Sequence, residues 1–256
     1  MGDVMGRRIV FLVYGAISYV IFLVALIYAV GFVANMVVPK GIDDGESGAF
    51  GTSILVDIIL LSLFAIQHSV MARPAFKRWW TMVVPEPIER STYVLLASLL
   101  LLLLYWQWQP LPVIVWDVGE SVFKWPILAA YLVGWLIALA STFMIDHFEL
   151  FGLKQIWYCL RGKPLPETAF KTHLLYRYIR HPLMLGFLIA FWAAPTMSQG
   201  RLLFAIVMTA YILVAIQIEE RDLTRMIGDD YHNYRREVSM LIPLPLIKRS
   251  RGAGGK

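Results

Sequence analysis

Two clusters of ionisable and aromatic residues lie near the C-terminus, on either side of a hydrophobic hairpin. The first cluster reads Tyr176-Arg177-Tyr178-Ile179-Arg180-His181-Pro182, with Gly186 four positions further on. The second consists of Glu219-Glu220 followed by Gly228, Tyr231 and Tyr234. Charged groups are costly at membrane depth, so ionisable residues that bracket an apolar hairpin indicate a functional site.

The first cluster has the residues that begin a helix and bind an anion. Pro182 suits the first helical position, where its missing N–H is not needed, and it keeps His181 out of the helical conformation. A helix N-terminus offers free N–H groups and a partial positive charge, which suit a carboxylate. Gly186, one turn further on, allows a backbone or a ligand to approach closely. The alternative is that Arg180 and His181 are ordinary flanking residues that reach the membrane interface.

The two glutamates of the second cluster end the last hydrophobic run. Adjacent side chains on a helix project about 100° apart, so Glu219 and Glu220 both face one cavity only at its edge. One role for such a carboxylate is to accept hydrogen bonds from an ammonium group or a ribose. The alternative is a solvated helix end paired with Arg221 and Arg225, which contributes only a few tenths of a kcal/mol.

The tyrosines of the second cluster follow a helix stop at Gly228. Tyr231 and Tyr234 lie on one face of the next turn, because side chains three positions apart are neighbours on a helix. A cation over an aromatic face gains about 0.5–2 kcal/mol, so these rings suit a sulfonium or an adenine. The alternative is that both tyrosines anchor the chain at the membrane interface.

The chain that carries these clusters is too apolar for a soluble domain. Its 256 residues are 59% hydrophobic, the formal net charge is +5, and the mean hydropathy is +0.64. A helix needs about 20 apolar residues to cross a hydrocarbon core about 30 Å thick. Six runs approach this length, at 9–37, 54–71, 92–108, 125–144, 183–197 and 202–218. The sequence therefore predicts an all-α, polytopic integral membrane bundle of about six transmembrane helices, the fifth of them short.

The charges of the connecting segments predict the orientation of this bundle. Arginine and lysine gather before the first run and in the segments 72–91 and 145–182, whereas aspartate and glutamate offset them at 38–53 and 109–124. Basic segments stay on the cytoplasmic side. We therefore expect both termini, and the two clusters, on the cytoplasmic side.

Two classes of function are disfavoured by composition. Nucleic-acid binding requires a basic face on a soluble module, and none is visible in the sequence. The single Cys159 excludes an internal disulfide and a cysteine-based metal site. We expect neither a nucleic-acid partner nor a metal.

The two clusters together resemble a known pattern. The order Arg-His-Pro-x-x-x-Gly, hairpin, Glu-Glu and Gly-x-x-Tyr-x-x-Tyr resembles the integral-membrane methyltransferases that use S-adenosyl-L-methionine, which include isoprenylcysteine carboxyl methyltransferases, phospholipid methyltransferases and NnrU-like proteins. The resemblance implies S-adenosylmethionine as the cofactor. The residues it implies for binding this methyl donor are Tyr176, Tyr178, Arg180, His181, Pro182, Leu183, Gly186, Glu219, Glu220, Tyr231 and Tyr234. Met184 stands where the family often has tyrosine, which indicates a different acceptor pocket.

Two further segments narrow the resemblance. Gln67-His68-Ser69 and the segment 146–155, with Gly162-Lys163-Pro164, are similar to the bacterial methanethiol S-methyltransferases of this family. This implies S-methylation of methanethiol to dimethyl sulfide in the bacterial inner (cytoplasmic) membrane. The partners implied are a small thiol and membrane lipid, and the active site would face the cytoplasm.

Three residues near the predicted cytoplasmic helix ends are candidates for the chemistry of the acceptor. His68 and His147 each offer an imidazole that, when neutral, can take a thiol proton, and Asp146 lies beside the second. A histidine at an interface is more often structural, so both interpretations remain open.

The sequence predicts one integral membrane methyltransferase domain at 1–245, with its donor-binding part at about 145–245 and a basic, disordered tail at 246–256. One alternative is a lipid or isoprenoid acceptor for the same donor site. Another is a non-catalytic membrane subunit or a carrier, although the chain lacks the inverted repeat typical of carriers.

Overall fold

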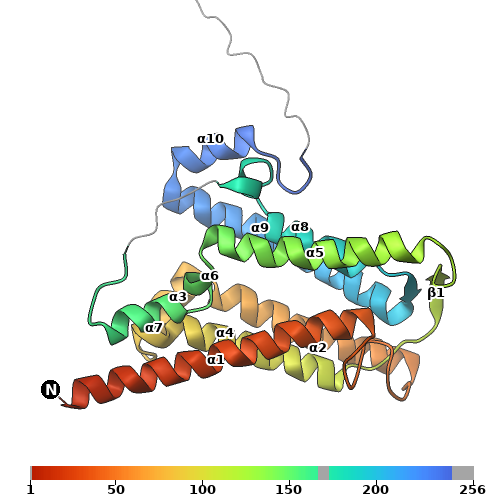
Figure 1. Cartoon of the computed structure of the whole chain (residues 1–256), viewed down its shortest axis with the longest axis horizontal. Helices are drawn as coiled ribbons and strands as arrows, with labels where there is room; N and C mark the ends of the chain where they lie inside the picture. Colours follow the sequence, from red (N-terminus) through yellow and green to blue (C-terminus); the bar gives the residue numbers. More distant parts are fainter. Residues whose placement is uncertain (1, 167–172, 244–256) are drawn as a thin grey trace, which may run out of the picture.

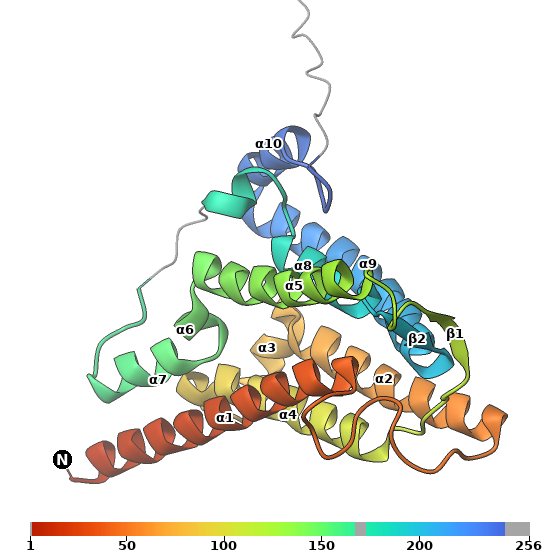
Figure 2. The same ribbon diagram turned by 45° about the vertical axis from the view of Figure 1, so that its right-hand side comes forward.

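The computed structural model is a bundle of long helices, with most of the shorter helices at one end of it (Figures 1 and 2). It describes residues 2–166 and 173–243, and the predicted tail lies outside this range. The long helices are α1 (Gly2–Ala34), α2 (Phe50–Met71), α4 (Glu86–Gln107), α5 (Lys124–Ile145) and α9 (Gln199–Ile227). The shorter helices are α3 (Pro74–Trp80), α6 (His147–Leu150), α7 (Leu153–Leu160), the 3-10 turn Leu174–Arg177, α8 (Pro182–Trp192) and α10 (Asp229–Glu237).

The prediction of a polytopic helical membrane protein is confirmed. The five long helices are each long and apolar enough to cross a membrane, and they match five of the predicted runs. The sixth apolar helix, α8, has only 11 residues. At a rise of 1.5 Å per residue it is about 16 Å long, roughly half of a hydrocarbon core.

Helix α8 ends earlier than predicted. We expected the fifth run to continue to residue 197, but the helix stops at Trp192. Pro195 follows closely, and a proline disfavours the helical conformation in the residue before it. The chain then forms β2 (Thr196–Ser198), which pairs antiparallel with β1 (Ile114–Asp117) before α9 begins. A short sheet therefore closes the end of the bundle opposite α6, α7 and α10 (Figure 1).

Helices α5 and α8 pack at close range through small residues. A Cβ atom on Gly134 would lie 2.7 Å from the nitrogen of Ala190, and one on Gly186 would lie 2.6 Å from the nitrogen of Ala138. The two pairs form reciprocal small-x-x-x-small contacts, which let membrane helices approach closely. The prediction that Gly186 admits a close neighbour is met by the backbone of α5.

We expect Gly186→Ala to destabilise the protein. The added methyl group would meet backbone atoms of Gly134 and Ala138, and overpacking of this kind costs about 1–3 kcal/mol. Thermal unfolding in detergent should show a lower midpoint than in wild type. Gly51→Ala on α2 is the control, because a Cβ there meets nothing within 4 Å. An equal midpoint for Gly186→Ala and wild type would contradict this packing.

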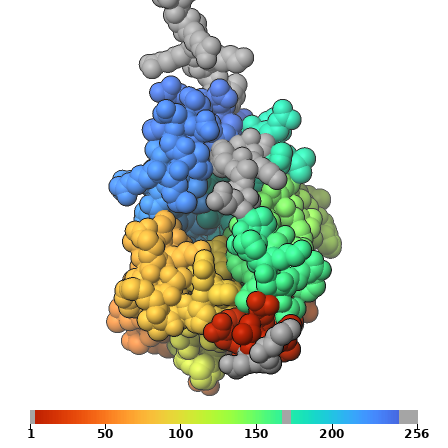
Figure 3. Space-filling view, turned by 90° about the vertical axis from the view of Figure 1, so that its left-hand side faces the viewer, coloured from red at the N-terminus to blue at the C-terminus, as the bar shows by residue number. Residues whose placement is uncertain are grey.

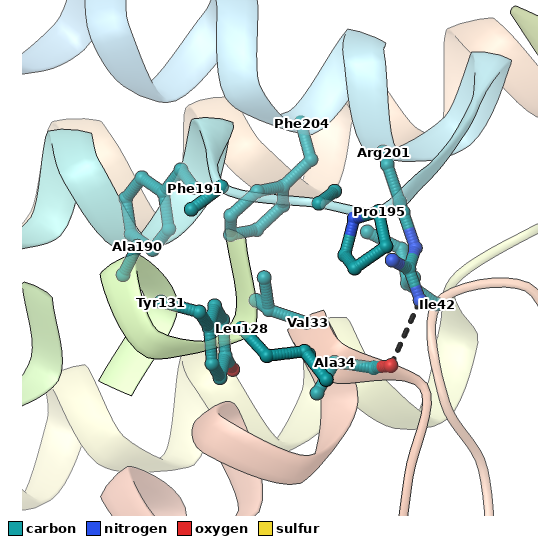
Figure 4. Close-up of a pocket in the computed structure, with 12 residues that line it drawn as sticks. Val33, Ala34, Ile42, Leu128, Tyr131, Ala190, Phe191, Pro195, Arg201 and Phe204 are labelled. Carbon is teal, nitrogen blue, oxygen red and sulfur yellow. Dashed lines mark hydrogen bonds between the residues drawn. The ribbon is translucent and has the colours of Figure 1, made fainter. Parts of the chain in front are cut away.

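The sheet end of the bundle is held by a buried arginine. Arg201 donates from Nε to Asp43 at 2.9 Å and from Nη2 to the carbonyl of Ala34 at 2.9 Å. Beside it lies a cavity of about 20 Å³ lined by Tyr131, Phe204 and neighbouring apolar side chains (Figure 4). This volume suits about one water molecule.

Candidate functional site

The two predicted clusters meet at the end of the bundle where α8 begins and α9 ends. After α10 the chain turns back and pairs with the residues that precede α8. Arg180 donates its backbone N–H to the carbonyl of Ser239 at 2.8 Å, and His181 donates to that of Met240 at 3.1 Å. These hydrogen bonds hold Ile179 beside Ser239, about 60 positions further along the sequence.

Glu220 is the centre of the polar network at this junction. One of its oxygens, Oε1, accepts hydrogen bonds from Arg180 Nε at 2.7 Å and from His181 Nε2 at 3.1 Å. The other, Oε2, lies 3.1 Å from Nε of Arg235. Since the side chain of Glu220 is only 3% exposed, three basic groups around it provide the partners that a buried carboxylate requires. Glu220 therefore joins α9 to the start of α8 and to α10.

Glu219 lies in a different environment from its neighbour. Its side chain is 44% exposed, and its nearest described basic atom is Nδ1 of His181 at 3.8 Å. That separation is longer than a hydrogen bond. The structure thus separates the two glutamates as the helical projection predicted. Glu220 faces the protein, and Glu219 is left accessible at the same helix end.

Arg180 makes further hydrogen bonds to the protein backbone. Besides Glu220, its guanidinium donates to the backbone carbonyls of Arg235 and Val238. The sequence pattern did not identify Arg235 as part of this network. The only available signal was its position directly after Tyr234. Arg180, Glu220 and Arg235 therefore form one ion network that joins the start of α8, the end of α9 and α10.

The tyrosines of the site differ in their exposure. Tyr231 is buried, Tyr176 is half-buried, and Tyr178 is 66% exposed. Tyr234 donates its hydroxyl to the carbonyl of Tyr176 at 2.6 Å, which fixes the turn before α8 against α10. The rings of Tyr231 and Tyr234 are neighbours, with centroids 5.9 Å apart. The two rings therefore share one face of α10, as predicted. Tyr231 is buried in the interior, and Tyr234 is partly exposed.

Burial and negative charge keep these phenols protonated. Burial, and then the carboxylates Glu220 and Glu219, raise the pKa of Tyr231. The pKa of Tyr176 is raised by burial and then by Glu219 and Tyr234. For Tyr234, burial raises the pKa to about 12, although Arg180 opposes the shift. These hydroxyl groups therefore act as hydrogen-bond donors and not as bases.

The start of α8 has the form expected for an anion site. Pro182 is buried at the first helical position. The next residues, Leu183 and Met184, follow directly, and the first N–H groups of a helix have no acceptor within it. His181 is buried beside them and donates to Glu220. The backbone geometry is thus compatible with a bound carboxylate.

His147 and Asp146 are held by other parts of the protein. Thr142 donates its hydroxyl to the carbonyl of Leu139 at 2.7 Å, so its oxygen accepts from Nδ1 of His147 at 2.8 Å. Nε2 then accepts from the hydroxyl of Tyr19 at 2.8 Å. Asp146 caps α6 by accepting from the N–H of Glu149. Both imidazole nitrogens are therefore engaged, which favours the structural interpretation of His147.

We expect His147 to make the protein less stable in mild acid. Burial lowers the pKa of His147 from its ordinary value of 6.5, and Asp146 only partly opposes this. The unfolded chain then binds more protons than the folded one, so stability is present above about pH 6.5 and declines below it. The unfolding midpoint should fall less between about pH 7 and pH 5 in His147→Gln than in wild type. A variant of the exposed His232, His232→Gln, should keep the wild-type slope, and equal slopes in all three proteins would contradict this role.

His68 lies in a different part of the structure, on the last turn of α2. The hydroxyl of Tyr93 lies 3.0 Å from each of its two ring nitrogens. Arg73 donates to the carbonyl of Ser69 and forms an ion pair with Asp222 of α9 at 2.9 Å. The structure thus brings His68 toward the helix that carries Glu219, whereas no described contact joins His147 to that helix. Tyr93 and Asp222 had no recognisable signal in the sequence.

The end of the bundle that carries these groups is hollowed. In Figure 3, which faces it, a recess lies between three parts of the surface. These are the orange and yellow region around α3, the green region around α7 and the blue region of α9 and α10. All of the predicted site residues other than Asp146 and His147 lie on helices or turns that meet around α9.

The fold and the site together define a polytopic membrane protein with a polar, buried ion network at one end of its bundle. The model of the NnrU protein family matches residues 56–238, and the chain belongs to this family. It is 56% identical to the methanethiol S-methyltransferase of Mycobacterium tuberculosis over 239 residues, which cover 93% of this chain and 98% of that protein. It is 55% identical to methanethiol S-methyltransferase 2 of Bradyrhizobium diazoefficiens over 96% of this chain and 94% of that protein.

More distant relatives occur in animals. Nurim of Mus musculus is 34% identical over 179 residues, which cover 67% of this chain and 68% of that protein. No solved structure matches the chain.

Proposed function

We propose that the protein transfers the methyl group of S-adenosylmethionine to methanethiol and releases dimethyl sulfide. The observation that carries this proposal is the identity above 50% to two methanethiol S-methyltransferases over more than 90% of each chain. A match of this extent includes both the donor clusters and the segments around His68 and 146–155. The lipid and isoprenoid alternatives rest on the C-terminal clusters alone.

The donor site, in this proposal, lies between the start of α8, the end of α9 and α10, within the donor-binding part at about 145–245. Glu219 supplies an accessible carboxylate for the ammonium group or the ribose. The first N–H groups of α8 suit the carboxylate. The half-buried ring of Tyr176 and the neighbouring Tyr231 suit the adenine or the sulfonium. The described residues therefore fit each part of this ligand.

The bound donor supplies an electrophilic methyl group on a positively charged sulfur. The protein holds the acceptor in line with it, and positioning of this kind accounts for much of the catalysis. The attacking thiolate and the sulfonium lose charge together as the bond forms. Exclusion of water by the surrounding helices favours this loss of charge. A simple alkyl thiol is mostly protonated near neutral pH, so its ionisation requires help from the site.

We also propose that this site faces the cytoplasm, with both termini on the same side, in a bacterial inner membrane. The basic segments 72–91 and 145–166 flank the site end of the bundle. Cys159 on α7 tests this, since it is the only cysteine and is partly exposed. A membrane-impermeant maleimide should label it only after cells are opened. Ser47→Cys in a Cys159→Ser background should react in intact cells, and the reverse pattern would contradict the orientation.

The acceptor is tested directly with purified protein. We expect dimethyl sulfide by gas chromatography when the protein is supplied with S-adenosylmethionine and methanethiol. Phospholipid and a prenylated cysteine serve as competing acceptors, and S-adenosylhomocysteine should inhibit. If lipid is methylated and no thioether forms, the acceptor is a lipid and not a thiol, and the proposed donor site is unaffected. Absence of any methylated product would favour a non-catalytic membrane protein.

A further inference from the structure

We propose that Tyr93 is a positioning residue on the acceptor side of the site, which orients His68 to remove the proton of the thiol. This inference rests on the proposed function and adds to it the side of the site from which the acceptor is activated. It is carried by the location of His68, by the hydrogen bond that holds it and by the contrast with the second tyrosine–histidine pair.

The first step places His68 at the depth of the donor cluster. Arg73, the residue before α3, forms an ion pair with Asp222 and so joins the turn that follows α2 to α9. His68 lies five residues before Arg73, and Glu219 lies three residues before Asp222. Both helices run from the sheet end toward the site end (Figure 1). His68 on the last turn of α2 and Glu219, one turn before Asp222, therefore lie at the same end of the bundle.

The second step connects His68 to α9 through aromatic contacts. The ring of Phe64 stacks on His68 with centroids 5.2 Å apart, and it contacts Tyr211 of α9 edge-on at 6.2 Å. Phe64 therefore links His68 to α9, the helix that carries the carboxylate that we assign to the donor.

The third step concerns the hydrogen bonds of the imidazole. The hydroxyl oxygen of Tyr93 is equally close to the two ring nitrogens of His68, at 3.0 Å. A neutral imidazole has one N–H and one acceptor nitrogen, so the oxygen of Tyr93 can accept from the protonated nitrogen while its own proton faces the backbone carbonyl of His68 at 3.4 Å. In His147, by contrast, two different hydroxyl groups hold the two nitrogens. The unprotonated nitrogen of His68 is then left for the proton of an incoming thiol, while Tyr93 holds the protonated nitrogen.

The reaction step follows from this arrangement. The thiol gives its proton to the available nitrogen of His68 and becomes a thiolate. The thiolate sulfur forms a bond to the methyl carbon, and the bond from that carbon to the donor sulfur breaks with its electron pair. The products are a thioether and S-adenosylhomocysteine, and the imidazolium then releases its proton to solvent. Tyr93 keeps the ring in the orientation that this transfer requires.

The test compares Tyr93→Phe with Tyr19→Phe. Each variant removes one hydroxyl from a tyrosine–histidine pair and keeps the ring. We expect Tyr93→Phe to lower kcat/KM for methanethiol on the order of 10-fold, because the net contribution of one hydrogen bond corresponds to about this change in rate. The Kd for S-adenosylhomocysteine and the unfolding midpoint should change little. Tyr19→Phe should keep wild-type kcat/KM, because His147 is not in the site.

A second thiol separates positioning from a merely structural effect. Trifluoroethanethiol is small and more acidic than methanethiol, so it needs less help to ionise. The loss in Tyr93→Phe should therefore be smaller with this thiol, and Tyr93→Phe should cause no further loss in a His68→Ala background. Equal losses with both thiols, or wild-type activity, would overturn the inference.

Two outcomes keep the inference separate from the proposed function. If wild type forms no thioether, the proposed function fails, and this inference fails with it. If wild type forms thioether and Tyr93→Phe is fully active, only this inference fails. Should Tyr93→Phe not fold, His68→Gln is measured with the two thiols instead, and an equal loss with both would overturn the role of the pair.

Discussion

Glu220→Ala is expected to abolish donor binding and to destabilise the protein. Removing this carboxylate leaves the buried His181 and the largely buried Arg180 without their shared partner, and Arg235 on α10 loses its ion pair. Loss of one member of a buried ion pair costs about 3–5 kcal/mol. The start of α8 and the turn around Tyr176 should then lose their fixed positions. Unfolding in detergent and calorimetric titration with S-adenosylhomocysteine measure the two effects.

The control for this prediction is Glu237→Ala on α10. Glu237 is exposed, so its removal should leave both the midpoint and the Kd near their wild-type values. Glu220→Gln keeps the shape of the side chain and removes its charge, so it should show an intermediate loss of stability. Wild-type stability and donor affinity in Glu220→Ala would contradict the framework role of this residue.

Glu219→Gln is expected to weaken donor binding without destabilising the protein. The side chain of Glu219 is 44% exposed and makes no described hydrogen bond to a basic group, so the folded state loses little. A hydrogen bond to a charged group contributes about 1.5–3 kcal/mol. Its loss corresponds to roughly 10- to 150-fold weaker binding of S-adenosylhomocysteine.

The two adjacent glutamates are expected to differ in their effects, so each serves as a control for the other. Glu220 should affect stability and binding together, whereas Glu219 should affect binding alone. Calorimetry and thermal unfolding on the same preparations provide both values. Unchanged affinity in Glu219→Gln would remove this residue from the donor site and would require another group to bind the ammonium or the ribose.

The sequence predicted the long helices well, because membrane spans depend mainly on the length of an apolar run. The five long helices match predicted runs, and Pro182 begins a helix as expected. The end of α8 was missed because the apolar run continues past Trp192. There Pro195 and the pairing of β2 with β1 override hydropathy. Tertiary pairing of this kind has no local signal.

The site was predicted as a set of residues but not as an arrangement. The sequence could show that Glu219 and Glu220 project in different directions. It could not show that Glu220 faces three basic groups, because Arg235 reaches it only after α10 folds back. Nor could it distinguish His68 from His147. That difference depends on Tyr93 and Tyr19, which lie 25 and 128 residues away from the histidines they bind.

The central claim is that the donor binds where α8 begins and α9 ends. Ultraviolet crosslinking of S-adenosylmethionine carrying a labelled methyl group, followed by peptide mapping, tests it most directly. The label should appear within residues 174–186 or 219–234, should be removed by excess S-adenosylhomocysteine, and should decrease in Glu219→Gln. Label that is competed by S-adenosylhomocysteine but maps only to the sheet end, around Asp43 or Arg201, would contradict the account.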